Sequence, residues 1–186
     1  MKNSELKKAL DFLREDYPTI PGLNRYSRYV RKKLERKKFN RAFEFFKDKN
    51  VIDIGSHIGF YASISSIYAS NVIAIDLNDD LLEAGKVFIE KLKIDNIVFE
   101  KKDMYTLDDK YFEKHNINAV LLHKIYGNTQ WSEDQSKNIF NLIRKYCDVA
   151  IFNKKEEVFQ EFLDDPNFTF QEIAYGSRSL FVITRK

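Results

Sequence analysis

The sequence has a single cysteine, Cys147, so it cannot form an internal disulfide, and this excludes the disulfide-stapled scaffolds of small secreted proteins. It has no apolar run near the roughly 18 to 20 residues of a membrane span. The residues that follow Met1 lack the apolar stretch of a signal peptide. These absences predict a cytoplasmic protein without a membrane partner. Six glycines and three prolines, with no low-complexity tract, point to a folded chain.

The charge is distributed unevenly along the 186 residues. The formal net charge is only +3, with 44% hydrophobic and 32% charged residues, which is a globular composition. Residues 1–41 nevertheless carry a balance of +8, and the rest of the chain carries −5. The basic residues are densest from Arg25 to Arg41. We therefore expect a basic helical extension over residues 1–50, which could act as a substrate lid, and a separate body over residues 51–186.

Short β-branched runs alternate with helical patterns from Val51 onward, which predicts a sheet built by right-handed parallel crossovers. Two closing strands follow each other without a helix between them, so they form an antiparallel hairpin. The prediction is an α/β fold with a doubly wound, mostly parallel, seven-stranded sheet and a C-terminal antiparallel hairpin. The expected strands are 51–54, 72–75, 97–100, 119–122, 149–152, 168–174 and 180–184, and the expected helices are 58–69, 78–93, 108–115, 132–146 and 155–163.

In an open sheet of this kind a ligand binds beyond the carboxyl ends of the strands. The first strand is followed by two glycines that bracket a tight turn, Gly55 and Gly59, and Asp53 comes just before them. Asp76 follows the second strand, and Asp103 the third. Each has a simpler interpretation: the glycines could only make a turn, Asp76 could only cap the next helix, and Asp103 could be a solvated loop acid.

Three segments of the sequence, VIDIGSHIG, IAIDLND and FEKKDMYTL, resemble class I S-adenosylmethionine-dependent methyltransferases, and the resemblance covers residues 51–186. It implies a Rossmann-like fold and S-adenosylmethionine as the cofactor. The implied contacts are Asp53, Gly55, Ser56, His57 and Gly59 to the methionine part, Asp76 to the ribose, Leu77 to the adenine, and Asp103 and Met104 to the adenine edge. His57 stands where the family usually has glycine, and the loop is similar to that of FkbM-like methyltransferases.

The catalytic residues are expected after the fourth strand, where His123 and Lys124 could serve as a general base for a hydroxyl acceptor. His123 could equally be a satisfied core group. The chain lacks the Asn/Asp-Pro-Pro-Tyr/Phe segment of enzymes that methylate nucleic-acid amines, and it lacks a Pro-Cys nucleophile. No Cys/His cluster has the spacing of metal ligands, so we expect no metal.

The sequence thus predicts a methyltransferase that acts on a hydroxyl or amine of a small or anionic molecule. Two alternatives remain open. One is an RNA methyltransferase that uses the basic N-terminal helix, and the other is a non-catalytic, cofactor-binding partner subunit. The basic helix could also be only a solvated surface helix that docks by its apolar stripe. The aromatic run Phe43–Phe46 is expected to be packing.

Overall fold

The protein is described from a computed structural model. The structure describes residues 41–122, 133–152, 164–175 and 178–186, together with Lys8, Asp11, Phe12, Glu15 and Phe162. The expected helix at 155–163 lies almost entirely outside the described residues, as do most of the expected N-terminal extension and Ser132.

The predicted architecture is confirmed, since the described strands form one seven-stranded sheet in the order β3-β2-β1-β4-β5-β7-β6. The first five strands are parallel, and β7 pairs antiparallel with both β5 and β6. The strand order runs outward from β1 in both directions, so the switch point lies between β1 and β4. The strands are β1 Asn50–Ile54, β2 Asn71–Asp76, β3 Ile97–Lys101, β4 Ala119–Leu122, β5 Val149–Phe152, β6 Phe168–Tyr175 and β7 Arg178–Arg185.

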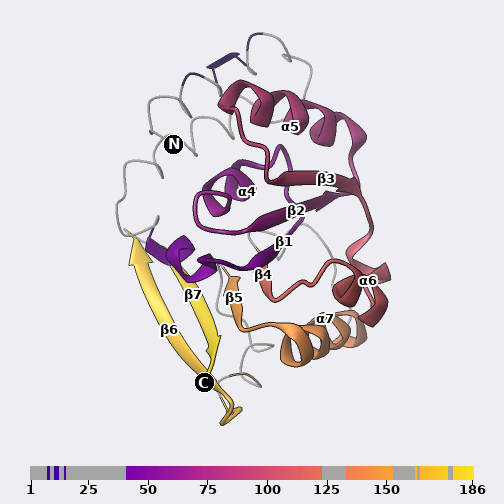
Figure 1. The fold of residues 1–186 in the computed structure, drawn as a ribbon. Helices are drawn as coiled ribbons and strands as arrows, with labels where there is room; N and C mark the ends of the chain where they lie inside the picture. Colours follow the sequence, from indigo (N-terminus) through magenta and orange to yellow (C-terminus); the bar gives the residue numbers. More distant parts are fainter. Residues whose placement is uncertain are drawn as a thin grey trace.

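Helices cover both faces of the sheet, as Figure 1 shows, with α4 and α5 on one side and α6 and α7 on the other. Each side has its own hydrophobic cluster, because side chains alternate between the two faces along every strand. The helical elements are η1 Ala42–Phe46, α4 Phe60–Ser65, α5 Asp79–Leu92, η2 Met104–Thr106, α6 Asp109–Lys114 and α7 Glu133–Tyr146. Strands β1, β4 and β5 are buried along nearly their whole length because they are covered on both faces.

The capping signals in the sequence place α5 and α6 correctly. The Asn78 side chain accepts a hydrogen bond from the Leu81 N–H at the start of α5, and Asp108 accepts one from the Tyr111 N–H at the start of α6. The end of α5 is a left-handed residue, Lys93, with φ of 55°. The predicted boundaries of these two helices are therefore confirmed to within about one residue.

The helix predicted at 58–69 is wrong in length, because α4 covers only Phe60–Ser65. Gly59 adopts a left-handed conformation immediately before it, so the helix cannot begin at Ile58. At the other end, the Ser65 hydroxyl donates to the Tyr61 carbonyl and the Ser66 hydroxyl donates to the Ser63 carbonyl. Hydroxyl groups that bond to the backbone in this way compete with regular helix formation.

The aromatic run before β1 belongs to the core, as predicted. Phe43 and Phe46 of η1 are fully buried in the cluster on the α4 and α5 side of the sheet. The ring of Phe43 stacks on that of Tyr61 of α4, with centroids 6.3 Å apart. The core of the body therefore extends to Ala42.

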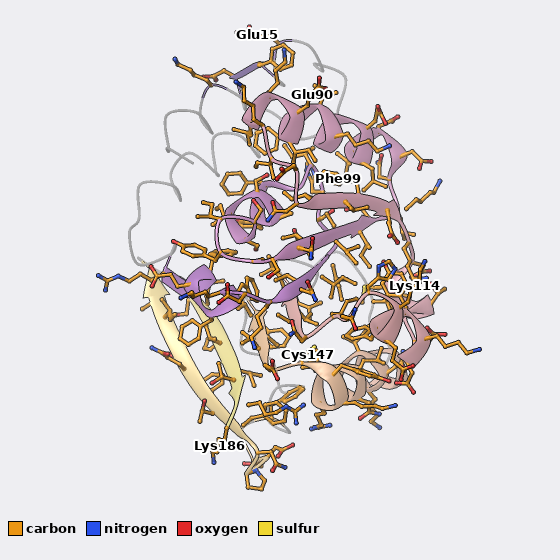
Figure 2. The ribbon with its side chains drawn as sticks, in the orientation of Figure 1. Glu15, Glu90, Phe99, Lys114, Cys147 and Lys186 are labelled. Carbon is orange, nitrogen blue, oxygen red and sulfur yellow. The ribbon has the colours of Figure 1, made fainter. Side chains whose placement is uncertain are left out.

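Phe99 of β3 holds the first loop and α5 close to the sheet, and Figure 2 labels it beside β3 and close to α5. A Cβ atom at Gly59 would lie 2.4 Å from the Phe99 Cζ atom, and one at Gly85 of α5 would lie 2.6 Å from Phe99 Cε1. A side chain at either position would therefore require the Phe99 ring to shift. No signal in the sequence identified Gly85 or Phe99, because the requirement arises from contacts between distant segments.

No helix in the described part of the chain is long and apolar enough to cross a membrane.

We expect Gly85→Ala to lower the free energy of unfolding by about 1–3 kcal/mol, the usual range for an overpacked core. This would reverse the stabilisation of about 1 kcal/mol that alanine normally gives inside a helix. Urea denaturation would measure the change, with the exposed Glu90→Ala of the same helix as control, expected within about 0.5 kcal/mol of wild type. Phe99→Leu in the same chain should reduce the effect, and a stabilising Gly85→Ala would contradict the contact.

Candidate functional site

The loop after β1 contains three left-handed residues at alternate positions. Gly55 has φ of 69°, His57 has φ of 56°, and Gly59 has φ of 70°. The two glycines adopt this conformation without strain, whereas a histidine in it costs on the order of 1 kcal/mol. The Ser56 N–H donates to the Ile75 carbonyl of β2 at 2.9 Å, and the Gly59 N–H donates to the Ser56 carbonyl at 2.9 Å. These bonds fix the loop against the ends of β1 and β2.

Asp76, at the end of β2, connects the first loop with the second. One carboxylate oxygen, Oδ2, accepts a hydrogen bond from the backbone N–H of His57 at 2.9 Å. The other, Oδ1, accepts one from the N–H of Asn78 at 3.1 Å. Each carboxylate oxygen has further acceptor capacity, so Asp76 can hold the loop and bind a hydroxyl donor at the same time. The cap of α5 is Asn78 itself, so the alternative role of Asp76 as a helix cap is not the one observed.

Asp53 lies on β1 with its side chain on the α4 side of the sheet, and it is only 2% exposed. Its neighbours in register are Ala74 of β2 and Leu121 of β4, both fully buried. The backbone N–H of Ala62, in the first turn of α4, bonds to the carboxyl group. Its Oδ2 atom has no hydrogen-bond partner in the part of the chain that the structure describes. Burial raises the pKa of Asp53 well above its ordinary range, and the charge of Asp76 adds to this, while the Ala62 N–H opposes it.

Ser56 brings a second buried polar atom to the same loop. The residue is 3% exposed, and its Oγ atom has no hydrogen-bond partner among residues whose positions are described. Buried polar atoms without partners are rare, and each requires an explanation such as a bound ligand or an ion. Asp53 and Ser56 therefore point to a polar group that the loop binds.

A cavity of about 130 Å³ opens at the carboxyl ends of β1 and β2. Gly55, Asp76, Leu77 and Met104, all predicted ligand contacts, line it. Leu77 is 61% exposed, so its apolar side chain is available for contact with a ligand in the cavity. Ligand pockets usually measure about 300–1,000 Å³, so this cavity is one part of a larger site.

Asp103 does not line this cavity. Its Oδ1 atom accepts a hydrogen bond from the Tyr105 N–H at 2.9 Å and thereby caps η2. The cap places the adjacent Met104 at the cavity wall. A contact between Asp103 and the adenine edge stays a prediction, as do the other ligand contacts predicted for individual residues.

Lys102 lines the cavity as well, and the sequence analysis missed it. Its ammonium group lies 4.6 Å from the ring centroid of Tyr111 of α6, which is a cation–π distance. The Tyr111 hydroxyl in turn donates to Glu100 Oε2 of β3 at 2.7 Å. The position of Lys102 directly before Asp103 was the available signal, but its orientation depends on α6.

His123 and Lys124, the predicted catalytic residues, lie outside the described residues, and so does the basic stretch from Arg25 to residue 40. Their roles stay predictions. In the described part of the chain, no group of three or more His, Cys, Asp or Glu side chains could hold a metal ion.

A larger cavity, of about 570 Å³, lies between the ends of α4 and α5 and the start of β3, and it contains none of the predicted site residues. It is lined by exposed or half-exposed residues such as Ile67 and Lys93, at the amino-terminal edge of the sheet. The residues with ligand-binding chemistry gather at the opposite edge, so we assign the site to the smaller cavity.

The described residues fit a nucleoside that carries an amino-acid tail. Asp76 offers acceptors for ribose hydroxyls, Leu77 and Met104 offer apolar contact for a base, and the unpartnered Asp53 Oδ2 offers an acceptor for an ammonium group. S-adenosylmethionine has all three groups.

The buried Asp53 predicts a pH-dependent stability. The folded protein keeps the Asp53 proton at pH values where the unfolded chain, with a pKa near 3.8, has lost it. The free energy of unfolding therefore falls as pH rises from about 4 through the raised pKa of the folded protein. Asp53→Asn retains an acceptor for Ala62 and cannot ionise. We expect its thermal midpoint to exceed that of wild type at pH 7–8, and the difference to shrink toward pH 4; a difference independent of pH would contradict the burial effect.

Comparison with known proteins supports the assignment of the fold. No family model matches the chain. The uncharacterized protein MJ1257 of Methanocaldococcus jannaschii is 26% identical over 158 residues, which are 72% of this chain and 45% of that protein. The chain thus spans less than half the length of this curated relative.

Two examples among the solved structures that match most of the chain are methyltransferases. Magnesium protoporphyrin IX methyltransferase (ChlM) from Synechocystis PCC 6803, with bound SAM, covers 96% of this chain and 97% of its own, with 16% identity and a TM-score of 0.61. An rRNA methylase from Streptococcus thermophilus covers 78% and 93%, with 14% identity and a TM-score of 0.61. With the strand order and the antiparallel β7, these likenesses confirm the predicted architecture: the chain has the Rossmann-like fold of class I S-adenosylmethionine-dependent methyltransferases.

Proposed function

We propose that this chain is an S-adenosylmethionine-dependent methyltransferase and that its acceptor is a hydroxyl or amine of a small or anionic molecule. The observation that carries the proposal is the buried, unpartnered Oδ2 atom of Asp53 beneath a loop of left-handed residues. A carboxylate oxygen in this position matches the ammonium group of the cofactor, and the cavity beside Asp76 matches its nucleoside.

The residues of the chain would act mainly by binding and orientation. When bound, S-adenosylmethionine supplies a methyl group that its sulfonium already activates. Asp53 and Ser56 would fix the methionine end, and Asp76 would fix the ribose while holding the first loop through His57. Restricting the ligand at both ends aligns the methyl group with an acceptor, and such alignment accounts for a large share of catalysis in transfer reactions. His123 or Lys124 would take the proton of a hydroxyl acceptor.

Cys147 is a poor nucleophile for this reaction. It is fully buried directly after α7, and burial together with the charge of Asp148 raises the pKa of its thiol. A covalent intermediate on this cysteine is therefore disfavoured, in agreement with the absence of a Pro-Cys motif from the sequence.

The affinity of the chain for S-adenosylmethionine and S-adenosylhomocysteine, measured by calorimetry, tests the cofactor assignment. We expect Asp76→Ala to weaken binding by about 10- to 100-fold, because charge-assisted hydrogen bonds contribute about 1.5–3 kcal/mol. Gly55→Arg should abolish binding, since its side chain would fill the cavity. Asp95→Asn, an exposed acid at the opposite edge of the sheet, is the matched control. Equal affinities for all four proteins, or no binding by wild type, would overturn the assignment.

Two other functions make different predictions about transfer. Incubation of a cell extract with radiolabelled S-adenosylmethionine should place label in small molecules if the proposal is correct. Label in an RNase-sensitive fraction, with transfer that falls steeply as salt rises, would favour an RNA methyltransferase with a basic N-terminal segment. Cofactor binding without transfer to any fraction would favour a non-catalytic partner subunit.

A further inference from the structure

The side chain of Asp53 lies in an apolar row that crosses the sheet. Toward one edge of the sheet, the next residues in register are Ala74 of β2 and Phe99 of β3. Toward the other edge they are Leu121 of β4, Ile151 of β5 and Val182 of β7. All of these except the half-buried Phe99 are at most 2% exposed. A carboxyl group in this row has lost its hydration shell, which strongly disfavours its charged form.

The described groups around Asp53 do not supply a compensating cation. Strand β4 contributes Leu121, α4 contributes the backbone N–H of Ala62, and β2 contributes the negative charge of Asp76. In the loop after β1, His57 directs its backbone N–H to Asp76. One hydrogen bond from Ala62 satisfies only part of an ionised carboxylate, which has about four acceptor sites. The neutral form of the carboxyl group avoids a buried negative charge that the surrounding groups satisfy only in part.

A ligand with an ammonium group reverses this balance. An opposite charge within about 4–6 Å favours the ionised form of a carboxyl group, and a charge-assisted hydrogen bond to Oδ2 would satisfy the atom that has no partner. The neutral form of Asp53 is therefore favoured in the ligand-free protein, and the ionised form is favoured in the ligand-bound protein.

We propose, on the basis of the function proposed above, that Asp53 is protonated in the ligand-free protein and releases its proton to solvent when the ligand's ammonium group binds at Oδ2. The O–H bond of the carboxylic acid breaks, the proton leaves to buffer, and the ligand keeps its own three ammonium protons. The complex thus contains a buried carboxylate–ammonium pair, and cofactor binding is linked to pH through a residue of the first loop.

The sign of the linkage follows from the proton count. Because the ligand-free protein holds one more proton than the complex, a higher pH favours binding. Affinity should rise by about tenfold per pH unit while Asp53 is protonated in the ligand-free protein, and it should become constant above the pKa of that state.

Calorimetry with S-adenosylhomocysteine between pH 5.0 and 7.0, in pairs of buffers with different ionisation enthalpies, measures the protons released. We expect close to one proton for wild type at the lower pH values and for the Asp95→Asn control, and none for Asp53→Asn. Methylthioadenosine keeps the adenine, the ribose and the thioether but lacks the ammonium group. It should bind more weakly and release no proton.

Three results would overturn the inference. They are tight binding by wild type without proton release, equal release by Asp53→Asn, and equal release with methylthioadenosine. Carbon-13 NMR of the aspartate carboxyl groups in the ligand-free protein gives a separate readout, in which the signal lost in Asp53→Asn should titrate well above pH 4. Absence of any binding by wild type would instead overturn the proposed function, and the NMR titration would still report whether Asp53 is protonated.

Discussion

The central strand of a doubly wound sheet is covered on both faces, and in this protein it carries an acid, Asp53, between Ala74 and Leu121. The carboxyl group can remain there because strand β1 ends one residue later, at Ile54, and the chain turns sharply at Gly55. The turn brings the first turn of α4 back over β1, and its Ala62 N–H reaches the carboxyl group. The remaining oxygen, Oδ2, is buried and has no hydrogen-bond partner in the described part of the chain.

The loop itself is held from outside by contacts that involve other strands. Two residues of β2 accept hydrogen bonds from the loop. The Asp76 carboxylate accepts one from the His57 N–H, and the Ile75 carbonyl accepts one from the Ser56 N–H. Phe99 of β3 packs where a side chain on Gly59 would otherwise lie. These contacts leave the loop little freedom to relax, which explains how a left-handed histidine persists in it. A loop fixed in this way can bind a ligand without first ordering its own backbone.

Asp53 lowers the stability of the folded protein, and in the proposed function it also binds the ligand. An acid in an apolar row lowers the stability of the folded protein at neutral pH, whereas a neutral residue of the same shape would not. Functional sites are where such conflicts between stability and chemistry are expected. Lys102 differs from Asp53, because its ammonium group lies over the Tyr111 ring and the Tyr111 hydroxyl donates to Glu100.

The amino-acid sequence by itself determined the order of strands and helices, because hydrophobic runs, capping residues such as Asn78 and Asp108, and the turn at Gly55 are local signals. It also located the acids at the ends of β1 and β2, since parallel strands bring their carboxyl ends to one edge. It could not determine the end of α4, the close approach of Phe99 to Gly85, or the orientation of Lys102. Only the tertiary structure decided these, because each depends on contacts between segments that are distant in the sequence, and local patterns do not record such distances.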